Sequence, residues 1–244
     1  MIAFGVLAGV WLASRRFKDR SLNGDHGASI AMWGVPAGIV GARLYHVVTD
    51  WSRFSGNWVE AIKIWNGGLG ILGGVIFGIA ATFIYCKRVE LDLRTALDVF
   101  APSIALAQVI GRWGNWFNQE LFGRPTDVPW ALRIDPEHRP TQYIEEATFH
   151  PTFLYESLWN LMVVIVLLQV DRTKRLSKGM LFVAYFALYS AGRLWVEALR
   201  IDEATMLSGV RVNIWVFSCV LLVSLYLLIN AEWKARKSKV EEPI

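Results

Sequence analysis

VFAPSIALAQVIGRWGNWFNQELFGRPTD, residues Val99 to Asp127, is the stretch that decides the fold. Its first part is an apolar run, and Arg112, Asn115 and Gln119 follow that run without a break. Helical geometry puts positions three or four apart on one face, so these three side chains are expected to form one polar stripe. A charge at the bilayer centre costs roughly 2.5–3.5 kcal/mol on insertion scales, so such residues are rare and usually functional. The alternative is a helix end that only reaches into the headgroups.

The composition of the whole chain indicates a polytopic membrane protein. Of 244 residues, 54% are hydrophobic and only 19% charged, and the mean hydropathy is +0.36. Twelve Trp and seven Tyr suit two interfacial aromatic belts. The basic residues gather at helix ends and not on one face, which argues against nucleic acid as a partner.

The sequence gives no sign of a cofactor. Cys86 and Cys219 lie far apart in or beside apolar runs, so both are expected to be core thiols and not a disulfide pair. A Cys/His cluster, a P-loop and a dinucleotide-binding glycine motif are all missing from the sequence. We therefore expect no metal, nucleotide or redox group.

The apolar runs predict an all-α integral membrane protein with seven transmembrane helices. The first run spans thirteen residues and reaches only about 20 Å, so its outer end is expected to be missing or very short. The basic residues follow this run, which argues against a signal peptide. The seven runs cover residues 1–13, 28–48, 67–85, 99–117, 153–170, 179–199 and 212–229.

Charge sorting predicts the orientation of these helices. Fifteen Lys and Arg residues fall in the loops and tail of one side, and six fall in the loops of the other. The positive-inside rule then puts the N-terminus outside and the C-terminus in the cytoplasm of a multi-pass protein of the cytoplasmic (inner) cell membrane. We expect one domain, residues 1–244, with a small extracytoplasmic head at about 122–150 and a charged cytoplasmic tail at about 232–244.

A glycine-rich segment opens the third run. Residues 67–74 read GGLGILGG, without the Lys and Ser or Thr of a phosphate loop. Two interpretations remain open for these glycines: tight helix packing, or direct contact of the backbone with a ligand.

The sixth run carries a second polar face. Tyr189, Arg193, Glu197 and Arg200 follow at helical spacing, and the predicted topology turns this end outward, as it does Arg112. An internal Arg193–Glu197 pair that only holds helices together is the structural alternative. Two arginines at matching depth favour an anionic partner, and arginine is suited to bidentate phosphate binding. The residues alone thus suggest a lateral cavity for an anionic phospholipid.

Four motifs in order resemble the prolipoprotein diacylglyceryl transferase family. The longest is Gly111-Arg112-x-Gly114-Asn115-Trp116-x-Asn118-x-Glu120-x-x-Gly123-Arg124. The others are the Trp65–Gly74 segment, His150-Pro151-x-x-x-Tyr155-Glu156, and Tyr189-x-x-x-Arg193-x-x-x-Glu197-x-x-Arg200. The resemblance covers nearly the whole chain.

The resemblance implies transfer of the diacylglyceryl group of phosphatidylglycerol to the lipobox cysteine of a prolipoprotein signal peptide, the first step of lipoprotein maturation. Arg112 and Arg193 would hold the phosphate and stabilise it as leaving group, with Glu120 and Tyr189 as further catalytic polar groups. The chain would act as a monomer without a cofactor. The remaining substrate-binding candidates are Asn115 to position the headgroup, Gly123 for close backbone approach, Glu197 to orient Arg193, and Asn118, His150 and Arg200.

One departure from the family leaves the general base open. Many members carry a His in the glycine-rich segment where this chain has Leu72. Glu120, His46 or His150 could replace it, or the arginines alone could lower the pKa of the substrate thiol, ordinarily near 8.5. The family's first helix also begins with an outer segment bearing Arg and Tyr, before the position at which this sequence starts.

Two other classes of function compete with the transferase. A transporter or flippase of an anionic lipid would require polar groups through the full membrane thickness, or inverted repeats. The inner halves of most of the apolar runs contain no such polar groups. A scaffold or insertase would not need two buried arginines at matching depth.

Overall fold

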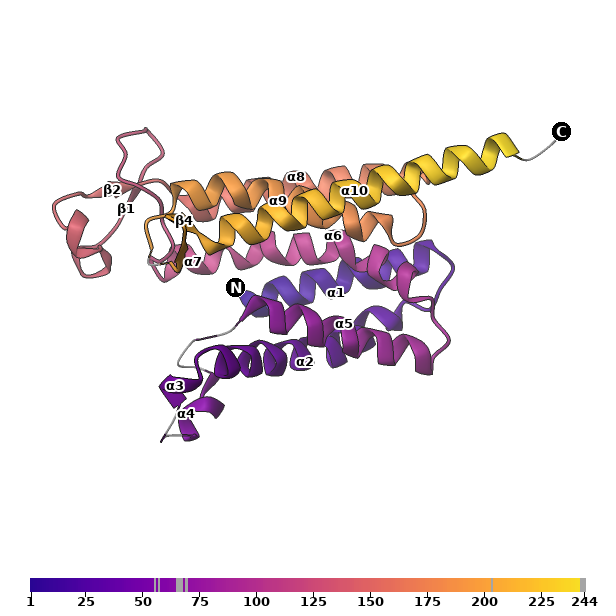
Figure 1. Cartoon of the computed structure of the whole chain (residues 1–244), viewed down its shortest axis with the longest axis horizontal. Helices are drawn as coiled ribbons and strands as arrows, with labels where there is room; N and C mark the ends of the chain where they lie inside the picture. The colour runs from indigo at the N-terminus through magenta and orange to yellow at the C-terminus, as the bar shows by residue number, and fades with distance from the viewer. Residues whose placement is uncertain (55, 57, 65–67, 69, 203, 242–244) are drawn as a thin grey trace. The chain divides into compact units, whose positions relative to one another are not determined.

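The computed structural model describes the whole chain except residues 55, 57, 65–67, 69, 203 and 242–244 (Figure 1). The described chain is mainly α-helical and divides into two compact units. Unit 1 consists of Met1–Gly9 and Leu97–Ile244, and unit 2 of Val10–Ala96.

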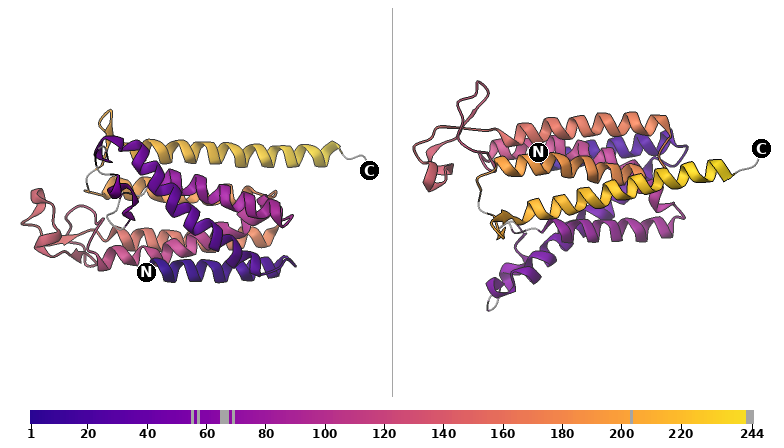
Figure 2. Two further views of the ribbon diagram at one scale, coloured as in Figure 1. Left: turned by 90° about the horizontal axis from the view of Figure 1, so that it is seen from below. Right: turned by 45° about the horizontal axis from the view of Figure 1, so that its top comes forward.

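Unit 1 is built from long helices, several of which have termini at the same end of the unit. It contains the start of α1 (Ile2–Asp19), most of α6 (Leu93–Gly111), then α7 (Trp113–Phe117), α8 (Thr152–Thr173), α9 (Met180–Leu199) and α10 (Val212–Glu241). Figures 1 and 2 show α8, α9 and α10 side by side, with successive helices running in opposite directions. The end of α6, the start of α8, the end of α9 and the start of α10 therefore lie at one end of the unit.

A glycine contact and a capping carboxylate fix how these helices pack together. A Cβ added to Gly5 would lie 2.7 Å from the carbonyl oxygen of Ala107, so α1 approaches α6 at backbone distance. At the opposite end, Asp98 of α6 accepts the backbone N–H groups of Gly179 and Phe182 at 2.7 and 3.0 Å. This carboxylate satisfies orphan donors of the first turn of α9, a capping role supplied by a neighbouring helix.

The segment between α7 and α8 forms a small head. Strands β1 (Leu132–Arg133) and β2 (Thr148–Phe149) pair antiparallel, with 3₁₀ turns η2 (Pro136–His138) and η3 (Thr141–Tyr143) between them. Phe122, Ile134 and Phe149 make its buried core. A second short hairpin, β3 (Met206–Leu207) with β4 (Val210–Arg211), connects α9 to α10.

Unit 2 centres on the antiparallel helices α2 (Asp25–Thr49) and α5 (Ile71–Arg88), with the rest of α1 and the short helices α3 (Trp51–Phe54) and α4 (Val59–Ile62). A Cβ on Gly41 would lie 2.5 Å from the carbonyl oxygen of Gly73, and one on Gly73 only 2.1 Å from that of Gly41. These contacts support the packing interpretation for this part of the glycine-rich segment. Residues 65–67 and 69 of the same motif lie outside the described residues.

Three helical stretches are long and apolar enough to cross a bilayer: Leu93–Phe117, Thr152–Thr173 and Val212–Ala235. Large apolar side chains also lie exposed on α2, α5 and α10, among them Trp33, Ile76 and Leu222. A lipid environment explains such faces, because hydrocarbon solvates them without cost. The chain is thus a membrane protein, and the seven-span topology stays a prediction.

Three local expectations were wrong. The polar stripe does not include Gln119, because α7 ends at Phe117 and Gln119 adopts a left-handed φ of +48°. Arg200 lies beyond the last residue of α9 in extended backbone (φ −71°, ψ 145°), so it does not continue that helix face. Cys219 is exposed on α10 and is not a core thiol, whereas Cys86 is buried.

Candidate active site

One buried carboxylate joins the two arginines that the sequence singled out. Glu156 lies in the first turns of α8 and is only 6% exposed. Its Oε2 is 2.5 Å from Nη2 of Arg112, at the junction of α6 and α7, and its Oε1 is 2.7 Å from Nη1 of Arg193 on α9. Cationic side chains from two separate helices thus converge on one anionic group.

Arg112 and Arg193 differ in how fully their donors are used. Arg193 contacts Glu156 through Nη1, and its Nη2 lies 2.7 Å from Oε2 of Glu197, one turn along α9. The described contacts of the Arg112 guanidinium all involve Nη2, the second being a long 3.5 Å approach to the Tyr189 hydroxyl. Since a guanidinium carries five N–H groups, Arg112, which is 19% exposed, keeps donors available for a ligand.

The network continues from Glu197 into α10. Glu197 is fully buried, and its Oε1 accepts from Nε of Arg211 at 2.7 Å and from Nδ2 of Asn213 at 3.1 Å. Arg211 also pairs with Asp202 at 3.1 Å, and Asp202 accepts from Nε of Arg200 at 2.6 Å. The site is therefore tied to the loop between α9 and α10.

Asp202, in the loop between α9 and α10, has a lowered pKa. Burial raises the pKa of Asp202, but hydrogen bonds and charges from Arg200 and Arg211 outweigh burial and hold it below its ordinary value of 3.8. Asp202 therefore stays ionised wherever the fold is intact at neutral pH.

The described ion pairs contain four arginines and three acids, so this cluster carries one positive charge in excess. The acids are Glu156, Glu197 and Asp202, and the cations are Arg112, Arg193, Arg200 and Arg211. Glu156, Arg193 and Glu197 are buried, whereas the other members are partly exposed, so the excess positive charge is carried by partly exposed arginines. The arrangement is suited to a monoanion.

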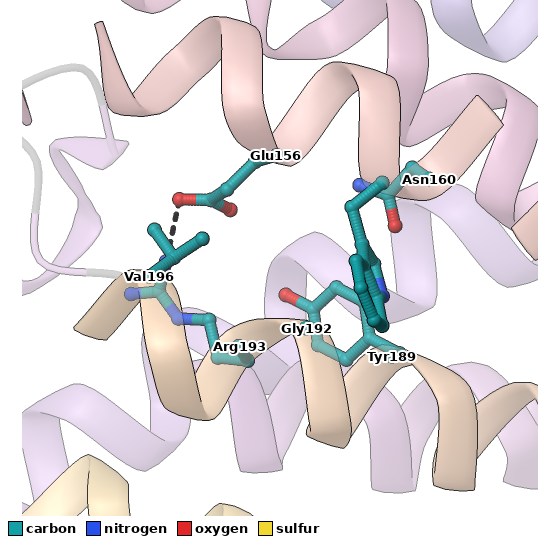
Figure 3. A pocket seen from close by; sticks show the side chains of 7 residues that line it. Glu156, Asn160, Tyr189, Gly192, Arg193 and Val196 are labelled. Carbon is teal, nitrogen blue, oxygen red and sulfur yellow. Dashed lines mark hydrogen bonds and ion pairs between the residues drawn. The ribbon is translucent and has the colours of Figure 1, made fainter. Parts of the chain in front are cut away.

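A small cavity of about 10 Å³, with room for about one water-sized group, lies beside these ion pairs, between α8 and α9 (Figure 3). Glu156 and Arg193 line its charged part. One helical turn along each helix, Asn160 and Tyr189 line a neutral part. Because α8 and α9 run antiparallel, these two levels are matched on both helices.

The other candidates of the central motif gather in a separate cluster. Oε1 of Glu120 accepts from Nδ2 of Asn115 at 3.0 Å and of Asn118 at 3.1 Å. Gln119 points to the head, where it exchanges hydrogen bonds with Asp135 at 2.6 and 2.7 Å. No described contact joins Glu120 to Arg112 or Arg193, so the structure brings together two groups where the sequence suggested one.

Gly123, His150 and Arg200 meet through the backbone. Gly123 N–H donates to the His150 carbonyl at 2.9 Å, and Gly123 and Arg200 form a β-bridge. A Cβ on Gly123 would lie 2.9 Å from that of His150 and 3.1 Å from the Leu199 carbonyl oxygen, so the chain itself fills this space. The side chain of His150 bonds the Tyr155 hydroxyl through Nδ1 at 3.0 Å.

Sequence reasoning missed three members of the site. Glu156 stood at the end of the His150–Glu156 motif without a role, and Arg211 was counted only as an outer-loop cation. Asp202 was not considered. The signal available for Glu156 was its place one turn inside an apolar run, where an unpaired carboxylate is costly. Within the described residues, no group of three or more His, Cys, Asp or Glu side chains could hold a metal ion.

Comparison with known proteins matches residues 1–230 to the family described as prolipoprotein diacylglyceryl transferase. The chain belongs to this family. Among its relatives, a protein of Frankia alni is 49% identical over 90% of this chain, and one of Streptomyces griseus is 44% identical over 99%. A protein of Cutibacterium acnes is 47% identical over 86%. All three are named phosphatidylglycerol–prolipoprotein diacylglyceryl transferase.

The chain does not span the full length of these family members. It covers 59% of the Frankia protein and 74% of the Streptomyces and Cutibacterium proteins. The matched region includes every residue of the Glu156 network, because Arg211 lies within residues 1–230.

Proposed function

We propose that this chain transfers the diacylglyceryl group of phosphatidylglycerol to the lipobox cysteine thiol of a prolipoprotein. The observation that carries the proposal is the convergence of Arg112 and Arg193 on the buried Glu156, in a partly buried cluster whose described ion pairs hold one positive charge in excess. A phospholipid phosphodiester carries one negative charge, which matches that excess. Family membership supplies the reaction class.

The charge change during the reaction favours a cationic site. The substrate sulfur, having lost its proton to the medium or to a base, attacks the glyceryl carbon that bears the phosphate. The carbon–oxygen bond breaks, a thioether forms, and glycerol phosphate leaves with the bonding electron pair on its oxygen. The phosphate thus goes from one negative charge towards two. Preorganised arginines stabilise that developing charge more than the starting charge, which is the condition for acceleration.

The two arginines would divide this task. Arg112 has the greater exposure and N–H groups without a partner among the described residues, so it would make the direct bidentate contact with phosphate. Arg193 is held from two sides by Glu156 and Glu197, so it would supply fixed positive charge and keep the cavity in shape. Tyr189, whose hydroxyl is 3.5 Å from Arg112, would limit the rotamers of that guanidinium.

Glu120 and its two amide partners would have a different part. Both Asn115 and Asn118 donate to one oxygen of Glu120, which fixes the turn that follows α7. We propose that this cluster borders the site and helps to position the headgroup, and that Gly123, His150 and Arg200 support its backbone frame.

The number and orientation of the membrane spans are also part of what we propose. Seven spans with the N-terminus outside would put the Glu156 network at the outer level of a cytoplasmic membrane, where secreted precursors emerge. The chain would work as a monomer.

The test is diacylglyceryl transfer from phosphatidylglycerol to a lipobox peptide by the detergent-solubilised protein. Arg112→Ala and Arg193→Ala should abolish most transfer, whereas Arg133→Ala, which changes an exposed arginine of β1, should not. Transfer that survives both site substitutions would contradict the assignment. Lipid flux across proteoliposomes without transfer would favour a flippase instead.

A further inference from the structure

The neutral part of the cavity contains an unsatisfied polar side chain. Asn160 lies on α8, one turn from Glu156, and is 2% exposed. Its Oδ1 is buried and has no hydrogen-bond partner within the described part of the chain. Figure 3 shows the Asn160 side chain lining the cavity, with its amide directed from α8 towards α9.

An orphaned amide in this place needs an explanation. Leaving a buried acceptor unpaired costs the desolvation of that group, and most buried polar atoms in proteins are satisfied. The neighbours of Asn160 in the cavity do not relieve it: Trp159 donates its Nε1–H to the Leu188 carbonyl at 2.9 Å, and Arg193 is engaged by Glu156 and Glu197. The amide is thus available to a ligand that can donate a hydrogen bond.

The position of Asn160 limits which part of a ligand it can meet. It lies one turn, about 5.4 Å, from the level of Glu156 and Arg193, which is the reach from a phosphate to the hydroxyls of its alcohol substituent. The cavity has room for about one water-sized group, which fits a hydroxyl and not an acyl chain. The diacylglyceryl half of a phospholipid contains ester oxygens, which accept and do not donate.

We propose that Asn160 binds a hydroxyl group of the polyol headgroup and thereby selects a glycerol-bearing phosphodiester. The inference rests on the proposed function, since it takes the arginines as the phosphate site. Asn160 Oδ1 accepts the hydroxyl hydrogen, and the amide N–H₂ can donate to the hydroxyl oxygen. The leaving group is then held at both ends, by arginines at its phosphate and by Asn160 at its alcohol.

The experiment compares two short-chain lipids that differ only in the headgroup hydroxyls: phosphatidylglycerol and phosphatidylpropanol. In transfer to a lipobox peptide, Asn160→Ala should lower kcat/KM for phosphatidylglycerol about 3- to 10-fold, the usual worth of one neutral hydrogen bond. The value for phosphatidylpropanol and the KM for the peptide should not change. Asn160→Ala should therefore remove the difference in kcat/KM between the two lipids.

Ser190→Ala is the matched control. Ser190 is buried and its Oγ, like Oδ1 of Asn160, has no hydrogen-bond partner among the described residues, but Ser190 does not line the cavity. Its removal should leave the ratio of the two lipids at the wild-type value. Neither substitution removes a described side-chain hydrogen bond, so both variants should fold with an unchanged melting temperature.

Other outcomes would overturn the inference. An equal fall in kcat/KM for both lipids would mean that Asn160 acts on the fold. A rise in the KM for the peptide alone would mean that the Asn160 amide contacts the peptide. The rise in melting temperature on adding each lipid is a second readout, which measures lipid binding separately from catalysis. If the wild type binds phosphatidylglycerol more tightly than phosphatidylpropanol but transfers nothing, the proposed function fails while the role of Asn160 stands. Equal shifts by the two lipids would exclude that role.

Discussion

Two buried arginines in this protein, Arg43 and Arg193, are used in opposite ways. Arg43 of α2 donates to three backbone carbonyls, those of Ala61, Gly68 and Glu60, at 2.8, 3.0 and 2.5 Å. Arg193 of α9 contacts two carboxylates and lines a cavity.

The difference is one of chemistry and not of burial. Backbone carbonyls are neutral and fixed, so Arg43 holds α4 and Gly68 on α2 as a structural clamp. Carboxylates are charged, and one of them is shared with Arg112, which keeps N–H groups that no described residue accepts. A buried arginine in an apolar helix therefore does not by itself mark a site. What marks a site is a cationic cluster with charge and donors left over.

Arg193→Ala should have the largest effect of any single change to either arginine. It removes the cation that Glu156 and Glu197 share and leaves each acid with one arginine, Arg112 or Arg211, so the cost should be at most that of a broken buried pair, about 3–5 kcal/mol. Transfer should be lost and the melting temperature should fall sharply. In the double variant Arg193→Met/Glu197→Gln, part of the thermal stability should return without transfer; recovery of neither would argue that packing and not charge is responsible.

Arg112→Ala should separate function from stability. One donor to the developing phosphate charge is worth roughly 10²–10³ in rate, so kcat should fall by about that factor. The melting temperature should change little, because Arg112 is partly exposed and only one end of its guanidinium is engaged. Arg112→Lys should restore little of the rate, since a lysine lacks the bidentate fork. Full activity in the lysine variant would show that charge alone suffices.

Arg43→Lys should lower stability and leave lipid binding unchanged, the reverse of Arg112→Ala. An ammonium cannot reach three carbonyls in the geometry of the guanidinium, so at least one buried acceptor is left unpaired, at a cost of about 1–3 kcal/mol. Hydrogen exchange should rise in residues 59–62, while the shift in melting temperature caused by added phosphatidylglycerol stays as in the wild type. Loss of that lipid response would mean that the Arg43 clamp also belongs to the lipid site.

The smallest expected effect is on pH dependence. The pKa of Asp202 is held below 3.8 in the folded protein, so its ion pairs contribute fully above the unfolded value. That contribution is lost as the pH falls through the lower, folded pKa. The melting temperature of the wild type should therefore drop more steeply below about pH 4 than that of Asp202→Asn. Parallel curves would show that Asp202 adds no pH-dependent stability.

The sequence by itself determined much of this protein. Apolar runs predicted helices and a membrane environment because the bilayer requires internal satisfaction of backbone groups. Motif order predicted the family, and helical spacing predicted that Arg193 and Glu197 share a face. The sequence also predicted a small head at about 122–150, and the prolines of that segment fit the short strands β1 and β2 and the 3₁₀ turns that the structure has there.

Only the tertiary structure decided which charges meet. Periodicity acts within one helix, so it could not show that Glu156 of α8 lies between Arg112 and Arg193, or that Arg211 closes on Glu197. The end of α7 at Phe117 separates Gln119 from the expected stripe, because the chain turns there towards the head. The unpaired amide of Asn160 is visible only once α8 packs against α9, since an apolar neighbourhood is what turns an ordinary asparagine into an unsatisfied one.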